Sequence, residues 1–231
     1  MKTFSKTLIK FLVIGTVALF TGCSVCNQSG GDGKVKVACL GASNTRGYQI
    51  GDTSKNAFPG QIQALAGEKW DVRNFGVGGT CVLRDVGMSY WNTLDLYQAI
   101  EFEPDIVVLD FCWNDLKPEN WKLLPDHFVD DYTVLIKTFQ ELPSKPRIIM
   151  LYPPVFRDEA GFTDSAWNRI KPLLDQVAQK NDIETIDLFS THAHIREYYN
   201  WDSVHFSIEG CKSVAKVIYD YIQTKTVSQN I

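Results

Sequence analysis

The stretch Val35–Gly47, VKVACLGASNTRG, joins an apolar run to a turn made of small and polar residues. Residues 35–40 are mostly apolar and predict a buried β-strand, while the glycines, serine and asparagine after them are typical of turns. Most turns of this composition do nothing further. The alternative is that the turn presents Ser43 as a nucleophile at the carboxyl end of a parallel strand, where open α/β sheets bind their ligands. Motifs elsewhere in the chain are needed to distinguish a plain turn from one that presents a nucleophile.

Further apolar and β-branched runs recur along the chain and are separated by segments with helical spacing. The runs that predict strands are Trp70–Phe75, Asp105–Phe111, Arg147–Leu151 and Ile183–Leu188. The clearest helical segments are Phe128–Gln140, Ser165–Lys180 and Ser207–Ile222, the last with Ser207 as N-cap. Continuous apolar strands that alternate with helices indicate an α/β fold, with a parallel sheet covered on both faces.

The N-terminus has the pattern of an export signal. Its first ten residues carry three lysines and no acidic residue, and the apolar run Phe11–Phe20 that follows is shorter than the roughly 20 residues of a membrane-spanning helix. Residues 1–22 are therefore expected to be a secretory signal. The tetrapeptide Phe20-Thr-Gly-Cys23 resembles the lipobox of bacterial lipoproteins, which implies that Cys23 is lipidated. An ordinary cleaved signal with an incidental cysteine is the alternative.

The remaining chain divides into a tether, one domain and a short tail. Residues 23–33 are small, polar and rich in glycine, as in a flexible tether. Residues 34–225 suffice for one domain with an ample core, and residues 226–231 form a C-terminal tail. The lipobox resemblance implies a location in the bacterial cell envelope, with the membrane as a partner through Cys23. Ser24 rather than aspartate after the cysteine favours sorting to the outer membrane.

Charge and cysteine placement exclude several classes of function. Residues 1–22 contain three of the 23 basic residues and none of the 27 acidic ones, so the mature chain has 20 against 27 and a formal charge of −7. Nucleic acid is therefore not an expected partner. The six cysteines do not follow the spacing of a disulfide framework or of a metal site. We expect no metal, no cofactor and no essential disulfide.

Three loops after the predicted strands contain groups suited to acyl transfer. Residues 74–80, NFGVGGT, hold three glycines whose backbone N–H groups could approach a ligand closely. Asn114 follows the third strand, where its side chain could donate to an oxyanion. Asp202 precedes His205 by three residues, so that a turn could bring the carboxylate onto the imidazole Nδ1–H and leave Nε2 free to take a proton. Singly, each of these features is commonplace.

In chain order, these features resemble the four sequence blocks of the SGNH hydrolases, also called the GDSL family, from about Lys34 to Ile222. The resemblance implies a three-layer sandwich with a five-stranded parallel, flavodoxin-like sheet. It also implies ester hydrolysis by Ser43 as nucleophile, with His205 as general base and then acid, and Asp202 as its orienter. The backbone N–H groups of Ser43 and Gly79 and the side chain of Asn114 would form the oxyanion hole.

The sequence departs from the family pattern at two positions. Ala42 stands where the first block usually has aspartate, and Cys112 stands where the third block usually has glycine. Cys112 and the bulky Trp113 are expected to narrow the site or to shift Asn114. A glycan-binding lipoprotein with a degenerate hydrolase site is the alternative that these departures suggest.

The substrate is indicated less directly. Aromatic rings suit the apolar faces of sugars, and the expected rim is rich in them: Tyr48, Trp91, Trp113, Trp121 and Trp201. Arg46 and Arg84 could hold a sugar carboxylate, and together with Trp113 and Trp201 they are the candidate substrate-binding residues. The overall pattern resembles bacterial sialate or carbohydrate O-acetylesterases, which implies an acetylated carbohydrate as substrate. A lysophospholipase or thioesterase, which needs an apolar trough, is the alternative enzyme.

Overall fold

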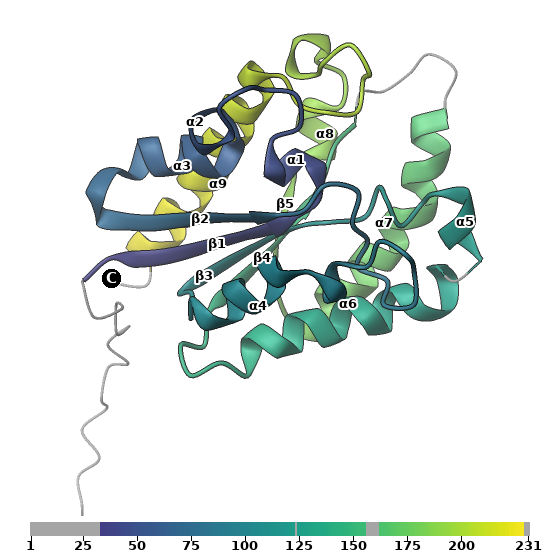
Figure 1. Ribbon diagram of the computed structural model, residues 1–231, viewed down its shortest axis with the longest axis horizontal. Helices are drawn as coiled ribbons and strands as arrows, with labels where there is room; N and C mark the ends of the chain where they lie inside the picture. Colours follow the sequence, from purple (N-terminus) through teal and green to yellow (C-terminus); the bar gives the residue numbers. More distant parts are fainter. Residues whose placement is uncertain (1–32, 123, 156–161, 229–231) are drawn as a thin grey trace, which may run out of the picture.

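The computed structural model describes residues 33–122, 124–155 and 162–228, and a five-stranded parallel sheet lies at its centre (Figure 1). The strands are β1 (Val35–Gly41), β2 (Trp70–Gly76), β3 (Ile106–Asp110), β4 (Arg147–Tyr152) and β5 (Glu184–Asp187). Their order is β2-β1-β3-β4-β5, which is the flavodoxin-like order. All four pairings are parallel. The predicted fold class is confirmed.

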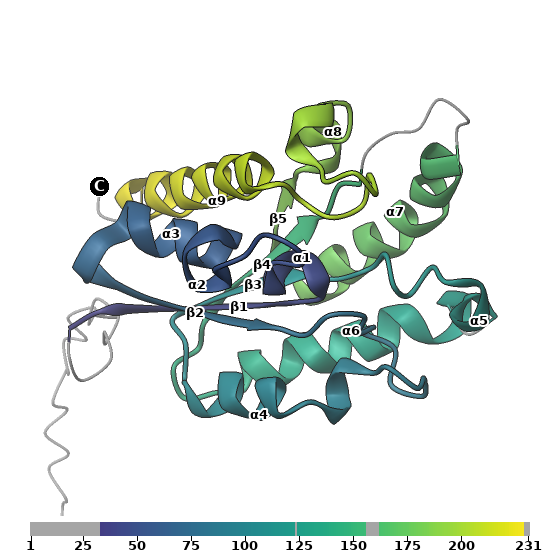
Figure 2. The same ribbon diagram turned by 45° about the horizontal axis from the view of Figure 1, so that its top comes forward.

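Helices cover both faces of the sheet (Figure 2). One layer contains α4 (Leu94–Glu101), α6 (Leu124–Gln140) and α7 (Phe162–Asn181), and the other contains α3 (Phe58–Ala66) and α9 (Ile208–Ser228). The shorter elements are α1 (Ser43–Arg46), α2 (Thr53–Asn56), α5 (Pro118–Trp121), α8 (Phe189–His192), η1 (Gly67–Lys69), η2 (Tyr90–Asn92) and η3 (Arg196–Tyr198). Among the described residues, no helix is long and apolar enough to cross a membrane.

Each face of the sheet has its own apolar core, because successive side chains of a strand point to opposite faces. Ala38 and Leu40 of β1 pack toward α4, α6 and α7, whereas Val37 and Cys39 pack toward α3 and α9. All five residues of the central strand β3 are buried. This two-sided burial explains why the central strands read as continuous apolar runs.

The helices are longer than the sequence pattern indicated. α6 begins at Leu124 rather than at Phe128, since Pro125 falls in the first turn, where proline is tolerated. α9 continues to Ser228, beyond the expected end at Ile222 and three residues into the expected tail. Residues 223–228, QTKTVS, contain neither glycine nor proline that would stop a helix.

The expected N-terminal features lie outside the described residues. These are the signal at residues 1–22, the lipidated Cys23 and the tether, of which the structure describes only Gly33. These three features therefore stay predictions. Because the strands are parallel, the turns that follow them meet at one edge, and this edge carries the candidate site.

Candidate active site

A cavity of about 520 Å³ lies at the carboxyl ends of the strands. Its walls come from α1, the glycine loop after β2, the loop after β3 and the loop before α9. The lining residues that carry polar or chargeable groups include Ser43, Arg46, Asp110, Asn114, Lys117 and His205. A serine, a histidine and an amide from distant parts of the sequence therefore share one cavity, which is the placement that the sequence motifs predicted.

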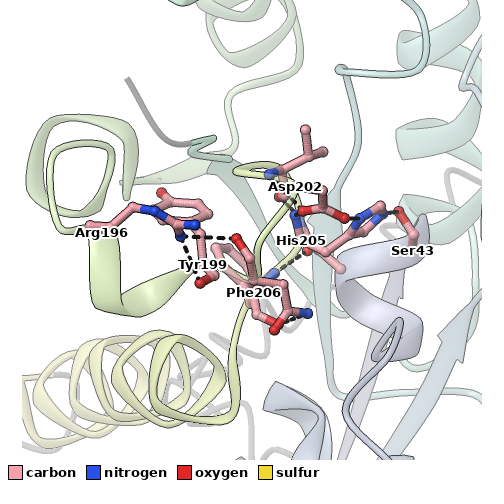
Figure 3. Close-up of polar contacts among 9 residues, drawn as sticks. Ser43, Arg196, Tyr199, Asp202, His205 and Phe206 are labelled. Atoms are coloured by element: carbon pink, nitrogen blue, oxygen red, sulfur yellow. Dashed lines mark hydrogen bonds and ion pairs between the residues drawn. The ribbon is translucent and has the colours of Figure 1, made fainter. Parts of the chain in front are cut away.

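Ser43, His205 and Asp202 form a continuous hydrogen-bonded row (Figure 3). Ser43 Oγ lies 2.8 Å from His205 Nε2, and Asp202 Oδ2 lies 2.7 Å from His205 Nδ1. A carboxylate accepts hydrogen bonds only, so Nδ1 carries the imidazole proton and Nε2 is left to accept the hydrogen bond that the serine hydroxyl donates. This is the arrangement that general-base activation of a serine requires.

The Asp202 carboxylate is held in its ionised form by the turn that follows it. Its Oδ1 accepts hydrogen bonds from the N–H groups of Val204 and His205, both at 3.0 Å. Burial raises the pKa of Asp202, but the hydrogen bonds from the backbone and imidazole of His205 and from Val204 outweigh it, so that the pKa is lowered from its ordinary value. The carboxylate is thus charged at neutral pH and can stabilise an imidazolium.

Asn44 ties the His205 loop to the nucleophile. Its Oδ1 accepts the N–H of Phe206 at 3.0 Å, and its Nδ2 donates to the carbonyl of Val204 at 3.3 Å. Asn44 follows Ser43 directly, and its two partners flank His205 on either side. One side chain therefore fixes the imidazole-bearing segment relative to α1. No motif considered in the sequence pointed to Asn44, since its role depends on a loop 160 residues away.

Tyr48 packs against the imidazole from the other end of the turn after β1. The ring centroids of Tyr48 and His205 are 4.3 Å apart, and the planes are inclined by 41°. The tyrosine also lines the cavity and is 46% exposed. Its ring therefore restricts the rotation of the imidazole and leaves a face open to a ligand.

Three hydrogen-bond donors belong to residues that line the cavity: Ser43, Gly79 and Asn114. Gly79 has a φ of 83°, a conformation that favours glycine, and it lines the cavity. Within the described residues, the N–H groups of Ser43 and Gly79 have no hydrogen-bond acceptor. Asn114 Nδ2 donates one of its two hydrogens to the carbonyl of Thr80 at 3.0 Å, which orients the amide and leaves the other hydrogen for a ligand. The three groups can together bind an oxyanion.

A buried carboxylate lies beneath the nucleophile. Asp110, at the end of β3, accepts a hydrogen bond from Thr45 Oγ1 at 2.7 Å. Burial raises the pKa of Asp110 to about 6, although this hydrogen bond opposes the rise. The contact needs glycine at position 41, since a Cβ there would lie 2.0 Å from Thr45 Oγ1 and 2.7 Å from the Asp110 carbonyl oxygen. Gly41 is thus required by close packing, whichever residue occupies position 42.

Asp115 joins the loop after β3 to the loop after β2. Its Oδ1 accepts the N–H groups of Val82 at 2.9 Å and Leu83 at 3.1 Å, and its side chain is fully buried. Burial raises the pKa of Asp115 to about 7, and the hydrogen bonds from the two N–H groups only partly offset it. Because Asn114 precedes Asp115 and Gly79 is near Val82 in sequence, this carboxyl group fixes the two loops that supply oxyanion donors.

Cys112 and Trp113 do not displace Asn114 from the cavity. Cys112 is buried and has a φ of 155°, in the region that side chains rarely adopt and that the glycine of the family pattern would enter freely. The Trp113 indole N–H donates to the Pro153 carbonyl at 2.8 Å, so the ring is fixed as part of the cavity wall. Of the two expected effects, narrowing of the site or a shift of Asn114, the structure shows that Asn114 still lines the cavity and that Trp113 forms part of its wall.

The predicted substrate-binding residues divide into two groups. Arg46 and Trp113 line the cavity. Arg84 is not among the described residues that line it, and its Nε forms an ion pair with Asp131 Oδ1 at 2.6 Å on the α6 side, so the expectation that Arg84 holds a substrate carboxylate is wrong. Trp201 is 79% exposed but is not among the described residues that line the cavity.

The other aromatic residues expected at the rim also differ in placement. The Trp91 indole N–H donates to the Val82 carbonyl at 3.0 Å, and the ring packs against the core. The side chain of Trp121 lies outside the described part of the structure. Lys117, which the motifs did not single out, lines the cavity. In the described ranges, no group of three or more His, Cys, Asp or Glu side chains could hold a metal ion.

Comparison with known families identifies the chain. Residues 39–212 match the GDSL-like Lipase/Acylhydrolase family. The chain belongs to this family. A curated relative, an acetylxylan esterase of Xylanibacter ruminicola, is 29% identical over 203 residues, which represent 80% of this chain and 42% of the relative. This GDSL-like protein therefore spans less than half of the relative that it matches.

Solved structures share the fold at lower sequence identity. An acetyl xylan esterase superimposes with a TM-score of 0.64 at 20% identity and covers 81% of this chain and 100% of its own. A carbohydrate acetylesterase family member from Sinorhizobium meliloti has a TM-score of 0.61 at 18% identity and covers 82% and 98%. These likenesses show that the GDSL-like chain has the fold of both proteins.

Proposed function

We propose that this protein is a serine esterase that removes O-acetyl groups from carbohydrates through an acyl-enzyme intermediate. The observation that carries the proposal is the row from Ser43 Oγ through His205 to Asp202, at the wall of a cavity lined by oxyanion donors. Membership of a lipase and acylhydrolase family supports the reaction class. The curated relative described as an acetylxylan esterase supports acetyl as the acyl group.

The geometry supports the following mechanism. Ser43 Oγ attacks the ester carbonyl carbon while His205 Nε2 takes the hydroxyl proton, and Asp202 stabilises the imidazolium that forms. The negative charge on the former carbonyl oxygen is stabilised by the N–H groups of Ser43 and Gly79 and by Asn114 Nδ2, donors that are each worth about 10²–10³ in rate.

Collapse of this intermediate breaks the bond to the sugar oxygen, which takes the proton from His205 and leaves as an alcohol. Water then attacks the acetyl-serine with His205 again as base, and acetate is released as Ser43 Oγ regains a proton. The serine proton moves between Ser43 Oγ and His205 Nε2, which are already in hydrogen-bond contact. The scheme needs no cofactor.

The lining of the cavity bears on which sugar carries the acetyl group. The cavity is lined partly by polar side chains and partly by the rings of Tyr48 and Trp113, a combination that suits a sugar ring with one small ester. Sialic acid, xylan and other acetylated glycans are all candidates. A panel of acetylated sugars, with released acetate as the readout, would rank them.

The proposal is tested with an aryl acetate and the Ser43→Ala variant. Wild-type protein should hydrolyse the ester, and Ser43→Ala should lose essentially all activity while it keeps the wild-type melting temperature. Activity that persists in Ser43→Ala would overturn the proposal, and an inactive wild type would favour the degenerate glycan-binding lipoprotein. A series of aryl esters with longer acyl chains separates the acetylesterase from a lysophospholipase or thioesterase, which would prefer the longer chains.

We also propose that the mature protein is anchored in the bacterial cell envelope by a lipid on Cys23, with outer-membrane sorting favoured by Ser24. The support is the basic and apolar N-terminus followed by Phe20-Thr-Gly-Cys23. Cys23→Ala should abolish both labelling by a fatty-acid analogue and retention in the membrane fraction. A variant that still takes up the label would show that the anchor is elsewhere.

A further inference from the structure

Two cationic side chains line the active-site cavity. Arg46 and Lys117 are both exposed and both belong to the cavity wall. Within the described residues neither forms an ion pair, whereas Arg84, Lys171 and Lys180 each pair with an aspartate. The acidic residue among the described lining groups is Asp110, which is buried and bonded to Thr45. The two exposed charged side chains of the cavity wall are thus cations, whereas the nearby carboxylates of Asp110 and Asp202 are hydrogen-bonded to Thr45 and to His205.

Arg46 lies close to the nucleophile. It follows Ser43 by three positions in α1, and residues at this spacing share one face of a helix. A Cβ added at Gly78 would lie 3.9 Å from Arg46 Nη1 and 3.9 Å from Ser43 Cβ, so both side chains flank the same point of the glycine loop. A ligand group bound by the guanidinium would therefore lie next to the reacting ester.

We infer that the sugar that carries the scissile acetyl ester also carries a carboxylate, which Arg46 binds and Lys117 attracts. The inference rests on the proposed function, which it narrows to acetylated acidic sugars. A guanidinium presents two parallel N–H donors that match a carboxylate. Most other charges of this acidic chain are screened beyond about 8 Å at physiological salt, and the nearby Asp202 already pairs with His205, so Arg46 and Lys117 are the charges left to interact with a substrate carboxylate.

The test compares one sugar in two charge states. The substrates are the methyl glycosides of mono-O-acetylated glucuronic acid, one positional isomer at a time, and the matching carboxamides, which have the same shape without the charge. Acetate release gives kcat/KM for each. The wild type should prefer the acid to the amide by roughly fivefold at low ionic strength, the size of an exposed ion pair, and added salt should reduce the preference.

Variants assign the preference to its residues. Arg46→Gln should bring the acid-to-amide ratio close to one, Lys117→Gln should lower it, and Arg46→Lys should retain part of it because the charge remains and the planar fork is lost. The acid-to-amide ratio of kcat/KM does not change when a substitution merely slows catalysis, because both substrates use the same catalytic groups. Lys212→Gln is the matched control, because Lys212 is exposed on α9 and is not among the described residues that line the cavity. It should leave the ratio unchanged.

The outcomes separate this inference from the proposed function. Equal kcat/KM for acid and amide in the wild type, or a ratio that Arg46→Gln leaves unchanged, would overturn the carboxylate preference. Hydrolysis of the amide that depends on Ser43 would in that case still support the carbohydrate acetylesterase. Failure to release acetate from any of these sugars, with an aryl acetate still hydrolysed, would count against both.

Discussion

The position after the nucleophile shows how one residue can organise a site made from distant parts of the chain. Asn44 accepts from the N–H of Phe206 and donates to the carbonyl of Val204, and His205 lies between these two residues. The neighbouring Ser43 is bonded to the imidazole itself. Two consecutive residues of α1 thus hold the catalytic loop, one through the reacting atoms and the other through the backbone.

We predict that Asn44→Ala lowers kcat for an aryl acetate about tenfold and leaves KM nearly unchanged. Each lost hydrogen bond is worth about 1 kcal/mol, and its loss frees the His205 loop to leave the aligned position. Steady-state kinetics measures kcat and KM, and thermal melts by circular dichroism measure the stability of the variant. Asn92→Ala, at an exposed position on η2, is the control and should be indistinguishable from wild type. Unchanged kcat in Asn44→Ala would show that the loop needs no such support.

Part of this site could be recognised from the sequence. Ser43, Asn114, Asp202 and His205 could be predicted because each belongs to a short motif at the end of an expected strand. Arg84 was assigned wrongly, since its partner Asp131 lies 47 residues away and no local pattern reveals the pairing. Asn44 and Asp110 were not singled out for the same reason, and Lys117 was missed because no short motif reveals that it lines the cavity.

At the scale of elements, the strands were predictable and their ends less so. β3 was expected at Asp105–Phe111 and is observed at Ile106–Asp110, because burial continues into the loop after hydrogen bonding within the sheet has ended. Apolar runs indicate buried residues, and residues can remain buried beyond the last hydrogen bond between neighbouring strands. For the helices, the first turn of α6 (LPDH) and the last turns of α9 (QTKTVS) lack the regular apolar spacing by which helices are recognised.

We predict that Val108→Asp abolishes folding, whereas Ser43→Ala leaves stability unchanged. Val108 is fully buried in the central strand β3, and a charge there would have no partner. Such burial costs several kcal/mol or more, comparable with the total stability of a domain of about 5–15 kcal/mol. Circular dichroism and solubility after expression provide the measurement. Val108→Ala is the control: it should fold and melt a few degrees below wild type. A folded Val108→Asp would contradict the packing described for this strand.

At the scale of the whole molecule, the active site is built on buried carboxyl groups that the fold must accommodate. Asp110 lies under the nucleophile turn, and Asp115 joins the two loops that carry the oxyanion donors. Both have a pKa above the ordinary value of 3.8, chiefly because burial disfavours the charged form. The arrangement that positions the site therefore makes the stability of the domain depend on pH.

The sign of this dependence follows from proton binding. Burial raises the pKa of Asp115 to about 7 in the folded protein, so between pH 4 and pH 7 the folded state holds a proton that the unfolded chain has lost. The contribution of Asp115 to stability is then fully present below about pH 4 and falls by about 1.4 kcal/mol for each pH unit up to the folded pKa. Above that pKa it is constant.

We predict that Asp115→Asn becomes progressively more stable relative to wild type as the pH rises from 4 to about 7, and that the difference levels off above this range. The asparagine oxygen can still accept the N–H groups of Val82 and Leu83, while the amide does not titrate. Thermal melts of both proteins at half-unit pH intervals from 4 to 8 measure the difference, and the mutation itself contributes only a constant offset. Asp110→Asn should show the same trend, ending near pH 6, where burial places the pKa of Asp110. A difference in melting temperature that stays constant across this range would mean that Asp115 is ionised throughout, and the loops of the site would then be joined by a carboxylate rather than by a carboxylic acid.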